Sequence, residues 1–120
     1  MTNAEFNNYF CDRTKEFAVR IIRFVESLPF NTTTKVLGTQ LCKSGTSTGA
    51  NYRAFCRARS KNELFSKICI VVEEADENIY WLDLFYASKF GNKEDIISLK
   101  AEAEEILKVS SATKNSLFPK

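Results

Sequence analysis

The sequence predicts an all-α protein, specifically an antiparallel up-down-up-down four-helix bundle. Helix breakers are rare, with 4 Gly and 2 Pro in 120 residues. Apolar residues recur at spacings of three and four, and no stretch shows the alternation that is typical of a strand. The expected connections are short, which favours antiparallel neighbours. A chain of this length and composition fits one globular domain, residues 1–120, with its own core.

The first helix is expected at about residues 12–28. Phe17, Ile21 and Phe24 share one face of it, as a buried helix stripe requires. Pro29 disfavours helical geometry in the residue before it and therefore closes this helix. The second helix is expected at about residues 35–58, because the polar residues 31–34 before it can cap its first turn.

The third helix has the clearest start. Ser60 and Glu63 fit a capping box, in which the two side chains satisfy each other's backbone amides. An apolar stripe then continues over residues 61–88. Gly91 is expected to stop this helix in a left-handed conformation, and Asn92 to cap a fourth helix at about residues 93–110. The tail, residues 111–120, is expected to fray.

The segment from Lys43 to Ser60 reads KSGTSTGANYRAFCRARS and raises the question of a phosphate-binding loop. Such a loop needs a lysine after its second glycine and a preceding strand, whereas Gly49 is followed by Ala50 and no strand is expected. The small residues are better explained as a helix face that lets a neighbouring helix approach closely. Two glycines cost a helix interior about 2 kcal/mol relative to alanine, so tertiary packing must offset that loss.

Charge is unevenly distributed although the net charge is only +2. The basic residues of the segment 43–67 are Lys43, Arg53, Arg57, Arg59, Lys61 and Lys67, and its one acid is Glu63. The segment 73–83 contains acids and no base. This asymmetry predicts either a dipolar molecule or a pairing of the two segments.

A turn near residue 60 would place the second half of helix two opposite the acidic part of helix three. This register predicts an ion pair from Lys43 and hydrogen bonds from the small polar side chains to carboxylates, which would otherwise be costly to bury. The predicted interhelix polar network contains Lys43, Ser44, Ser47, Asn51, Glu73, Glu74, Asp76 and Glu77.

No histidine occurs in the chain. This excludes Ser-His and Cys-His nucleophilic pairs, the Glu-x-x-His ligands of di-iron bundles and most zinc sites. The acidic cluster at residues 73–77 could bind a cation or act as an acid-base pair, but such clusters are more often a solvated face or the partner of a basic helix. We therefore expect a protein that is not an enzyme, with no catalytic residue, metal site or cofactor.

The basic residues are the main functional candidates. Arg53 and Arg57 share a helix face one turn apart, near Tyr52 and Phe55, and basic side chains beside aromatic ones suit phosphate contact and base stacking. The alternative is that cations at a helix C-terminus only complement its dipole or are solvated. The predicted nucleic-acid-binding residues are Arg53, Arg57, Arg59, Lys61 and Lys67.

The end of the third helix is apolar on almost every side, which exceeds the stripe that one bundle core requires. Trp81, Leu84 and Phe85 are therefore candidates for an oligomer interface, since aromatic residues are enriched in interface cores. Burial between two neighbouring helices of the same chain is the alternative.

The four cysteines form no CxxC pair and are expected to be reduced, as in a cytoplasmic protein. The N-terminus does not resemble a signal peptide, and the longest apolar run, Ile68 to Val72, is too short for a membrane span. A cytoplasmic protein with no membrane partner is expected.

Several segments together resemble the 23S rRNA intervening-sequence protein family. They are LGTQLCKSGTSTGANYR from Leu37, RARSKNEL from Arg57, EEADE from Glu73 and YWL from Tyr80. The resemblance runs from about Phe17 to Leu107 and implies a small four-helix bundle without catalytic residues. Related bundles include the accessory protein of diversity-generating retroelements, a pentameric barrel that binds nucleic acid and a reverse transcriptase.

The resemblance and the residues together predict a non-enzymatic, homo-oligomeric accessory module. The resemblance implies a closed ring, with five subunits as the expected number, and RNA, DNA, a reverse transcriptase or another protein as partners. The alternative is a protein-protein interaction scaffold that does not bind nucleic acid.

Overall fold

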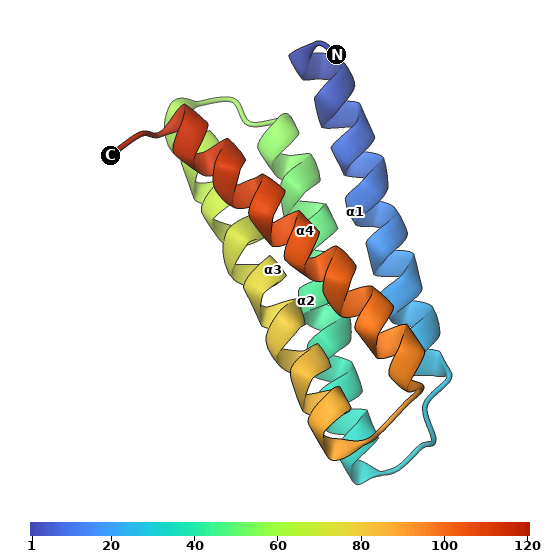
Figure 1. The fold of residues 1–120 in the computed structure, drawn as a ribbon. Helices are drawn as coiled ribbons and strands as arrows, with labels where there is room; N and C mark the ends of the chain where they lie inside the picture. The colour runs from blue at the N-terminus through green and yellow to red at the C-terminus, as the bar shows by residue number, and fades with distance from the viewer.

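The computed structural model describes residues 1–120 as four α-helices joined by short turns, without a strand. The helices are α1 (Asn3–Glu26), α2 (Thr32–Cys56), α3 (Lys61–Ser88) and α4 (Lys93–Leu117). Successive helices run in opposite directions, and each packs on the next, with α4 returning to α1 (Figure 1). The predicted four-helix bundle is confirmed. None of the four helices has a stretch both long and apolar enough to span a bilayer.

Helix α1 begins at Asn3, well before the predicted start at Asp12. The reason is a capping box at Thr2, whose hydroxyl accepts the Glu5 N–H at 3.1 Å while the Glu5 carboxylate accepts the Thr2 N–H at 3.2 Å. The helix ends at Glu26, slightly earlier than predicted, and Pro29 follows its last turn.

Helix α2 starts at Thr32 and ends at Cys56, so the predicted range 35–58 is shifted. Its cap is Asn31, whose side-chain oxygen accepts the Thr34 N–H at 2.9 Å. The Thr34 hydroxyl oxygen in turn accepts the Asn31 N–H at 3.1 Å. Helix α3 has the predicted bounds. Ser60 caps it by accepting the Glu63 N–H at 3.1 Å, but the reciprocal bond of the expected capping box is not formed.

The turn between α3 and α4 uses two residues with positive φ. Lys89, with φ of 63°, caps α3 in the left-handed conformation, and Gly91 follows with φ of 85°. The helix stop therefore precedes the expected Gly91. Asn92 caps α4 as predicted, because its side chain accepts the Asp95 N–H at 3.0 Å.

Helix α4 continues to Leu117, so the prediction of a frayed tail from residue 111 is wrong. Ser110 is buried and donates to the Ile106 carbonyl at 2.7 Å. Beyond the helix, the Phe118 ring packs edge-on against Phe65 of α3, with ring centroids 4.8 Å apart. The contact between Phe118 and Phe65 holds the end of α4 against α3.

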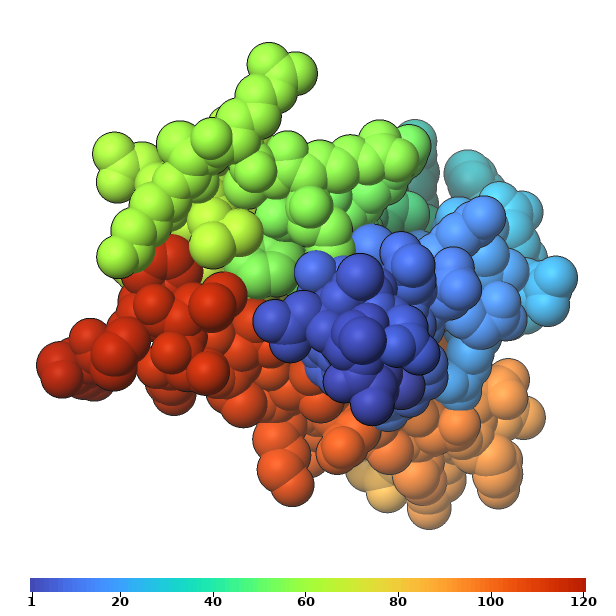
Figure 2. Space-filling view, turned by 90° about the horizontal axis from the view of Figure 1, so that it is seen from above, coloured from blue at the N-terminus to red at the C-terminus, as the bar shows by residue number.

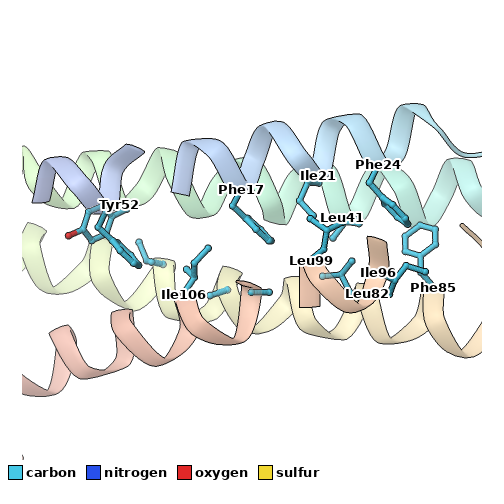
Figure 3. Close-up of a cluster of buried hydrophobic side chains, with 14 of the residues drawn as sticks. Phe17, Ile21, Phe24, Leu41, Tyr52, Leu82, Phe85, Ile96, Leu99 and Ile106 are labelled. Atoms are coloured by element: carbon cyan, nitrogen blue, oxygen red, sulfur yellow. The ribbon is translucent and has the colours of Figure 1, made fainter. Parts of the chain in front are cut away.

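The core runs along the bundle axis between all four helices, as Figure 3 shows. Toward one end Phe24 and Phe85 pack edge to face at 5.3 Å between ring centroids, and toward the other Phe10 and Tyr52 do so at 4.7 Å. Each such ring contributes roughly 1.5–3 kcal/mol through burial. One buried polar bond crosses the core, from the Asn78 amide of α3 to the Thr48 hydroxyl of α2 at 3.0 Å.

The glycines of α2 explain the small-residue segment, and their neighbour is α1. A Cβ on Gly49 would lie 3.3 Å from the backbone oxygen of Thr14, and a Cβ on Gly45 would lie 3.0 Å from the Ile21 side chain. The predicted close approach is thus observed, with backbone nearly touching backbone. This packing offsets the low helix propensity of glycine.

Helices α1 and α4 make the least extensive of the interhelix contacts. The Arg13 guanidinium binds the Glu102 carboxylate through two bonds of 2.8 and 2.7 Å, and Arg20 donates to Ser98 at 2.7 Å. No side-chain hydrogen bond joins the α1 segment before Arg13 to α4. The start of α1 and the end of α4 diverge there (Figure 1).

Candidate nucleic-acid interface

The structure gathers the predicted nucleic-acid-binding residues at and near the α2–α3 turn. Arg53 and Arg57 are exposed one turn apart at the end of α2, Arg59 lies in the turn, and Lys61 opens α3. Lys67 is half-buried one and a half turns further along α3. None of the five forms an ion pair, since the ion pairs of the chain are Arg13–Glu102 and Lys100–Asp83.

Four of these cations, all except Lys67, belong to a longer segment that lacks acids. No Asp or Glu occurs from Ser27 to Asn62, a range that contains the whole of α2 and the α2–α3 turn. Lys35 and Lys43 add to the positive charge of this range. The sequence prediction did not include Lys35, although the missing acids upstream of Lys43 were a signal for it.

The solvent-exposed face of α2 forms a basic surface, which we call the α2 ridge. It consists of the exposed residues Thr39, Lys43, Thr46, Ala50, Arg53 and Arg57. The two threonine hydroxyls donate to carbonyls of their own helix at 2.7 Å, so the cations are separated by short side chains only. An exposed cationic surface of this kind is accessible to a phosphate backbone.

The ridge faces away from the core because the opposite side of α2 packs against α1 and the core. Gly38, Gly45 and Gly49 lie against α1, while Leu41, Tyr52 and other apolar residues enter the core. The rotation of α2 about its axis is therefore fixed by packing. The basic residues are left on the solvent side as a consequence.

The predicted interhelix polar network is not formed as expected. Ser44 is buried but donates to the Leu41 carbonyl at 3.2 Å, and the Asn51 amide donates to the Ser47 carbonyl and hydroxyl at 2.9 and 2.8 Å. These side chains satisfy their hydrogen bonds within α2, because the neighbouring backbone acceptor is closer than a carboxylate of α3. The crossing bond is the one between Thr48 and Asn78, which the sequence did not predict.

The acidic part of the predicted network remains solvated. Glu73, Asp76 and Glu77 are exposed, and no ion pair joins Lys43 to Asp76 or Glu77. Glu74 is half-buried, and burial together with the charges of Glu77 and Glu73 raises the pKa of its carboxyl, which nearby Lys43 partly counteracts. No group of three or more Cys, Asp or Glu side chains is arranged to hold a metal ion.

The predicted interface residues differ in their exposure. Phe85 is 0% exposed and packs on Phe24, so its assignment to an oligomer interface is wrong. Trp81 and Leu84 are half-buried at the surface of α3, and the neighbouring Tyr80 is 56% exposed. The apolar run thus divides between the core and a surface patch made of Tyr80, Trp81 and Leu84.

Two cysteines distant in sequence meet between α1 and α2. The sulfur atoms of Cys11 and Cys56 lie 3.7 Å apart, and both residues are half-buried. Burial is the main cause that raises the pKa of the Cys56 thiol to about 12, and the neighbouring Cys11 is a second cause. The pair therefore consists of two thiols in contact, which the sequence spacing did not indicate.

Comparison with known proteins places the chain in a family. Residues 7–112 match the family described as 23S rRNA-intervening sequence protein. The chain belongs to this family. The match confirms the resemblance carried by the α2 segment, the α2–α3 turn and the acidic part of α3.

A solved structure of the same fold belongs to a protein of unknown function from the S23 ribosomal protein family of Bacteroides thetaiotaomicron. It is 32% identical, covers 91% of this chain and 97% of its own, and superposes with a TM-score of 0.81. The comparison with curated proteins gives no match. The family name refers to ribosomal RNA, whereas the structural relative has no stated activity.

Proposed function

We propose that this member of the 23S rRNA-intervening sequence protein family is a non-enzymatic, homo-oligomeric module that binds nucleic acid. The observation that supports it best is the acid-free segment from Ser27 to Asn62, whose cations are exposed and form no ion pair. Phosphates would contact the α2 ridge and the cations of the α2–α3 turn. RNA is the first candidate, because the family name refers to a ribosomal RNA.

Binding of this kind releases counterions, so its affinity falls steeply with salt. The test is a titration of labelled structured RNA and duplex DNA across a salt series. Neutralising several phosphates gives a slope of log affinity against log salt steeper than about −3. The triple reversal R53E, R57E and R59E is expected to abolish measurable binding.

A matched control reverses the same amount of charge elsewhere. Arg23, Lys93 and Lys108 are exposed and lie outside the segment 27–62. Their replacement by glutamate is expected to weaken binding by less than about tenfold, through long-range charge alone. Equal losses in the two triple variants would contradict a localised interface, and no binding by the wild-type protein at low salt would contradict the proposal itself.

Self-association is proposed through the patch of Tyr80, Trp81 and Leu84. Tyr80 is 56% exposed and lies edge-on to Trp81, with ring centroids 5.0 Å apart, so this aromatic surface is available to a neighbouring subunit. The same patch is the basis of the alternative function, a protein-binding scaffold whose partner could be a reverse transcriptase or another protein.

Sedimentation of the wild-type protein and of Y80E tests this patch. The substitution is expected to shift an oligomer to the monomer, because it places a charge in the interface core. Tyr9 is 47% exposed on α1 and supplies the control Y9E, which should keep the wild-type mass. A monomeric wild-type protein that binds nucleic acid would contradict the oligomer and leave the basic surface supported.

A further inference from the structure

A groove opens at the end of the bundle that holds both termini and the α2–α3 turn. Its volume is about 550 Å³, and it lies between the first turns of α1, the end of α2, the start of α3 and the end of α4. Figure 2 looks onto this end, where the start of α1 in blue, the α2–α3 segment in green and the end of α4 in red meet. We call it the terminal groove.

The walls of the terminal groove combine apolar surface with a few polar groups. Phe6 and Leu64 are half-buried in it, and Leu117 is 44% exposed at its edge. Asn7 lies among them and accepts a hydrogen bond from the Tyr52 hydroxyl at 3.1 Å, while its own amide hydrogens have no partner in the chain. Such a lining suits a flat, apolar ligand with hydrogen-bond acceptors on its edge.

The rim of the groove carries two of the unpaired cations. A second depression of about 430 Å³ contains Arg59 and Lys61, and it shares Ala58, Leu64 and Leu117 with the terminal groove. The cations therefore lie beside the apolar lining, and neither forms an ion pair. A ligand that spans both depressions would combine an apolar ring with an adjacent negative charge.

An unpaired nucleotide has this combination of properties. Its base is a flat heterocycle with acceptors on its edge, and it stacks on aromatic side chains when it is not paired. Its phosphate lies next to the base along the strand. A base inside a duplex cannot enter such a groove without first leaving the stack.

We propose that the terminal groove holds an unpaired base of a single-stranded nucleic acid, while Arg59 and Lys61 bind the phosphate beside it. This inference rests on the nucleic-acid binding proposed above and specifies its substrate class. A protein segment or a second copy of the chain is the competing occupant. The positive rim, in a segment without acids, favours a polyanion over either.

The test compares a short single-stranded RNA with a strand of the same length that lacks bases and keeps every phosphate. Stacking is worth a factor of roughly 5 to 150 per base. The wild-type protein should therefore bind the strand with bases at least about fivefold tighter. Fluorescence anisotropy at one salt concentration measures both affinities.

The groove is filled by A112W, because Ala112 is exposed and lines the groove from α4. This variant should lose the preference for the strand with bases and bind the abasic strand as the wild type does. The matched control is A101W, at an exposed alanine of α4 that does not line the groove. It should keep the preference. If circular dichroism shows A112W to be unfolded, S116F fills the groove from the same helix.

The outcomes separate this inference from the function on which it rests. Equal wild-type affinity for the two strands, or a preference that survives A112W, overturns the base-binding groove and leaves phosphate binding intact. No binding of either strand overturns the base-binding groove, and the titration of structured RNA and duplex DNA then decides the proposed function separately. If sedimentation shows that A112W, but not A101W, dissociates an oligomer, the groove is occupied by a second copy of the chain and the inference is wrong.

Discussion

The two ends of the bundle are built differently. At the end that holds the α1–α2 and α3–α4 connections, the Phe24 and Phe85 rings close the core and Gly91 lies directly against Phe24. At the other end the helices separate around the terminal groove, and apolar residues such as Phe6 and Leu64 stay partly exposed. Both ends therefore contain a buried aromatic pair, but the hollow at the open end, about 550 Å³, is larger than the one of about 310 Å³ beside Phe85 and Gly91.

The largest expected effect is at the closed end. F24A removes a side chain that is 4% exposed and should lower the free energy of unfolding by about 3–5 kcal/mol. At the open end, L117A removes a residue that is 44% exposed and should cost less than about 1 kcal/mol. Urea unfolding followed by circular dichroism measures both. Similar losses for the two variants would contradict the difference between the ends.

A smaller effect is expected for the turn that closes the same end. G91A should destabilise the protein by about 1–3 kcal/mol, because φ is 85° and the added Cβ would lie 2.8 Å from the Phe24 ring. K89G makes the opposite change at the neighbouring left-handed residue, where φ is 63°, and should stabilise by up to about 1 kcal/mol. Thermal melts of both variants provide the measurement, and a neutral G91A would show that the turn can relax.

The smallest expected effect concerns the reactivity of Cys56, which lines the terminal groove at the open end. Burial raises the pKa of the Cys56 thiol to about 12, so little thiolate is present near neutral pH. Alkylation of Cys56 by iodoacetamide at about pH 8 should be at least about tenfold slower in the native protein than in urea. Mass spectrometry gives the rate for each cysteine. Equal native and denatured rates would mean that this end unfolds locally.

The sequence predicted the middle of each helix better than its ends. Period and caps located α3 fully, because Ser60 caps its first turn and an apolar stripe follows. The start of α1 was missed although Thr2 and Glu5 fit a capping box, since this signal precedes the apolar stripe. The end of α4 depends on the packing of Phe118 on α3, which is a tertiary contact without a local signal.

The candidate site was predicted in its charge but not in its shape. The cations of residues 53–67 were identified from composition, because charge is read directly from the residues. The rotation of each helix was not predictable in the same way. It sends Phe85 into the core and leaves Trp81 at the surface, and it pairs Asn78 with Thr48. The terminal groove depends on the divergence of α1 and α4, and no pattern of residues in the sequence predicts this divergence.

The acid-free segment also affects how the molecule behaves among its own copies. All 15 acidic residues lie outside the range Ser27 to Asn62, so α2 carries only cations in a protein whose net charge is +2. Near its pI of about 8.3 the protein should therefore still adsorb to a cation exchanger, and in one preferred orientation. At low ionic strength α2 of one molecule attracts the acidic part of α3 of the next. Moderate salt screens this attraction, so added salt should raise the solubility of the protein.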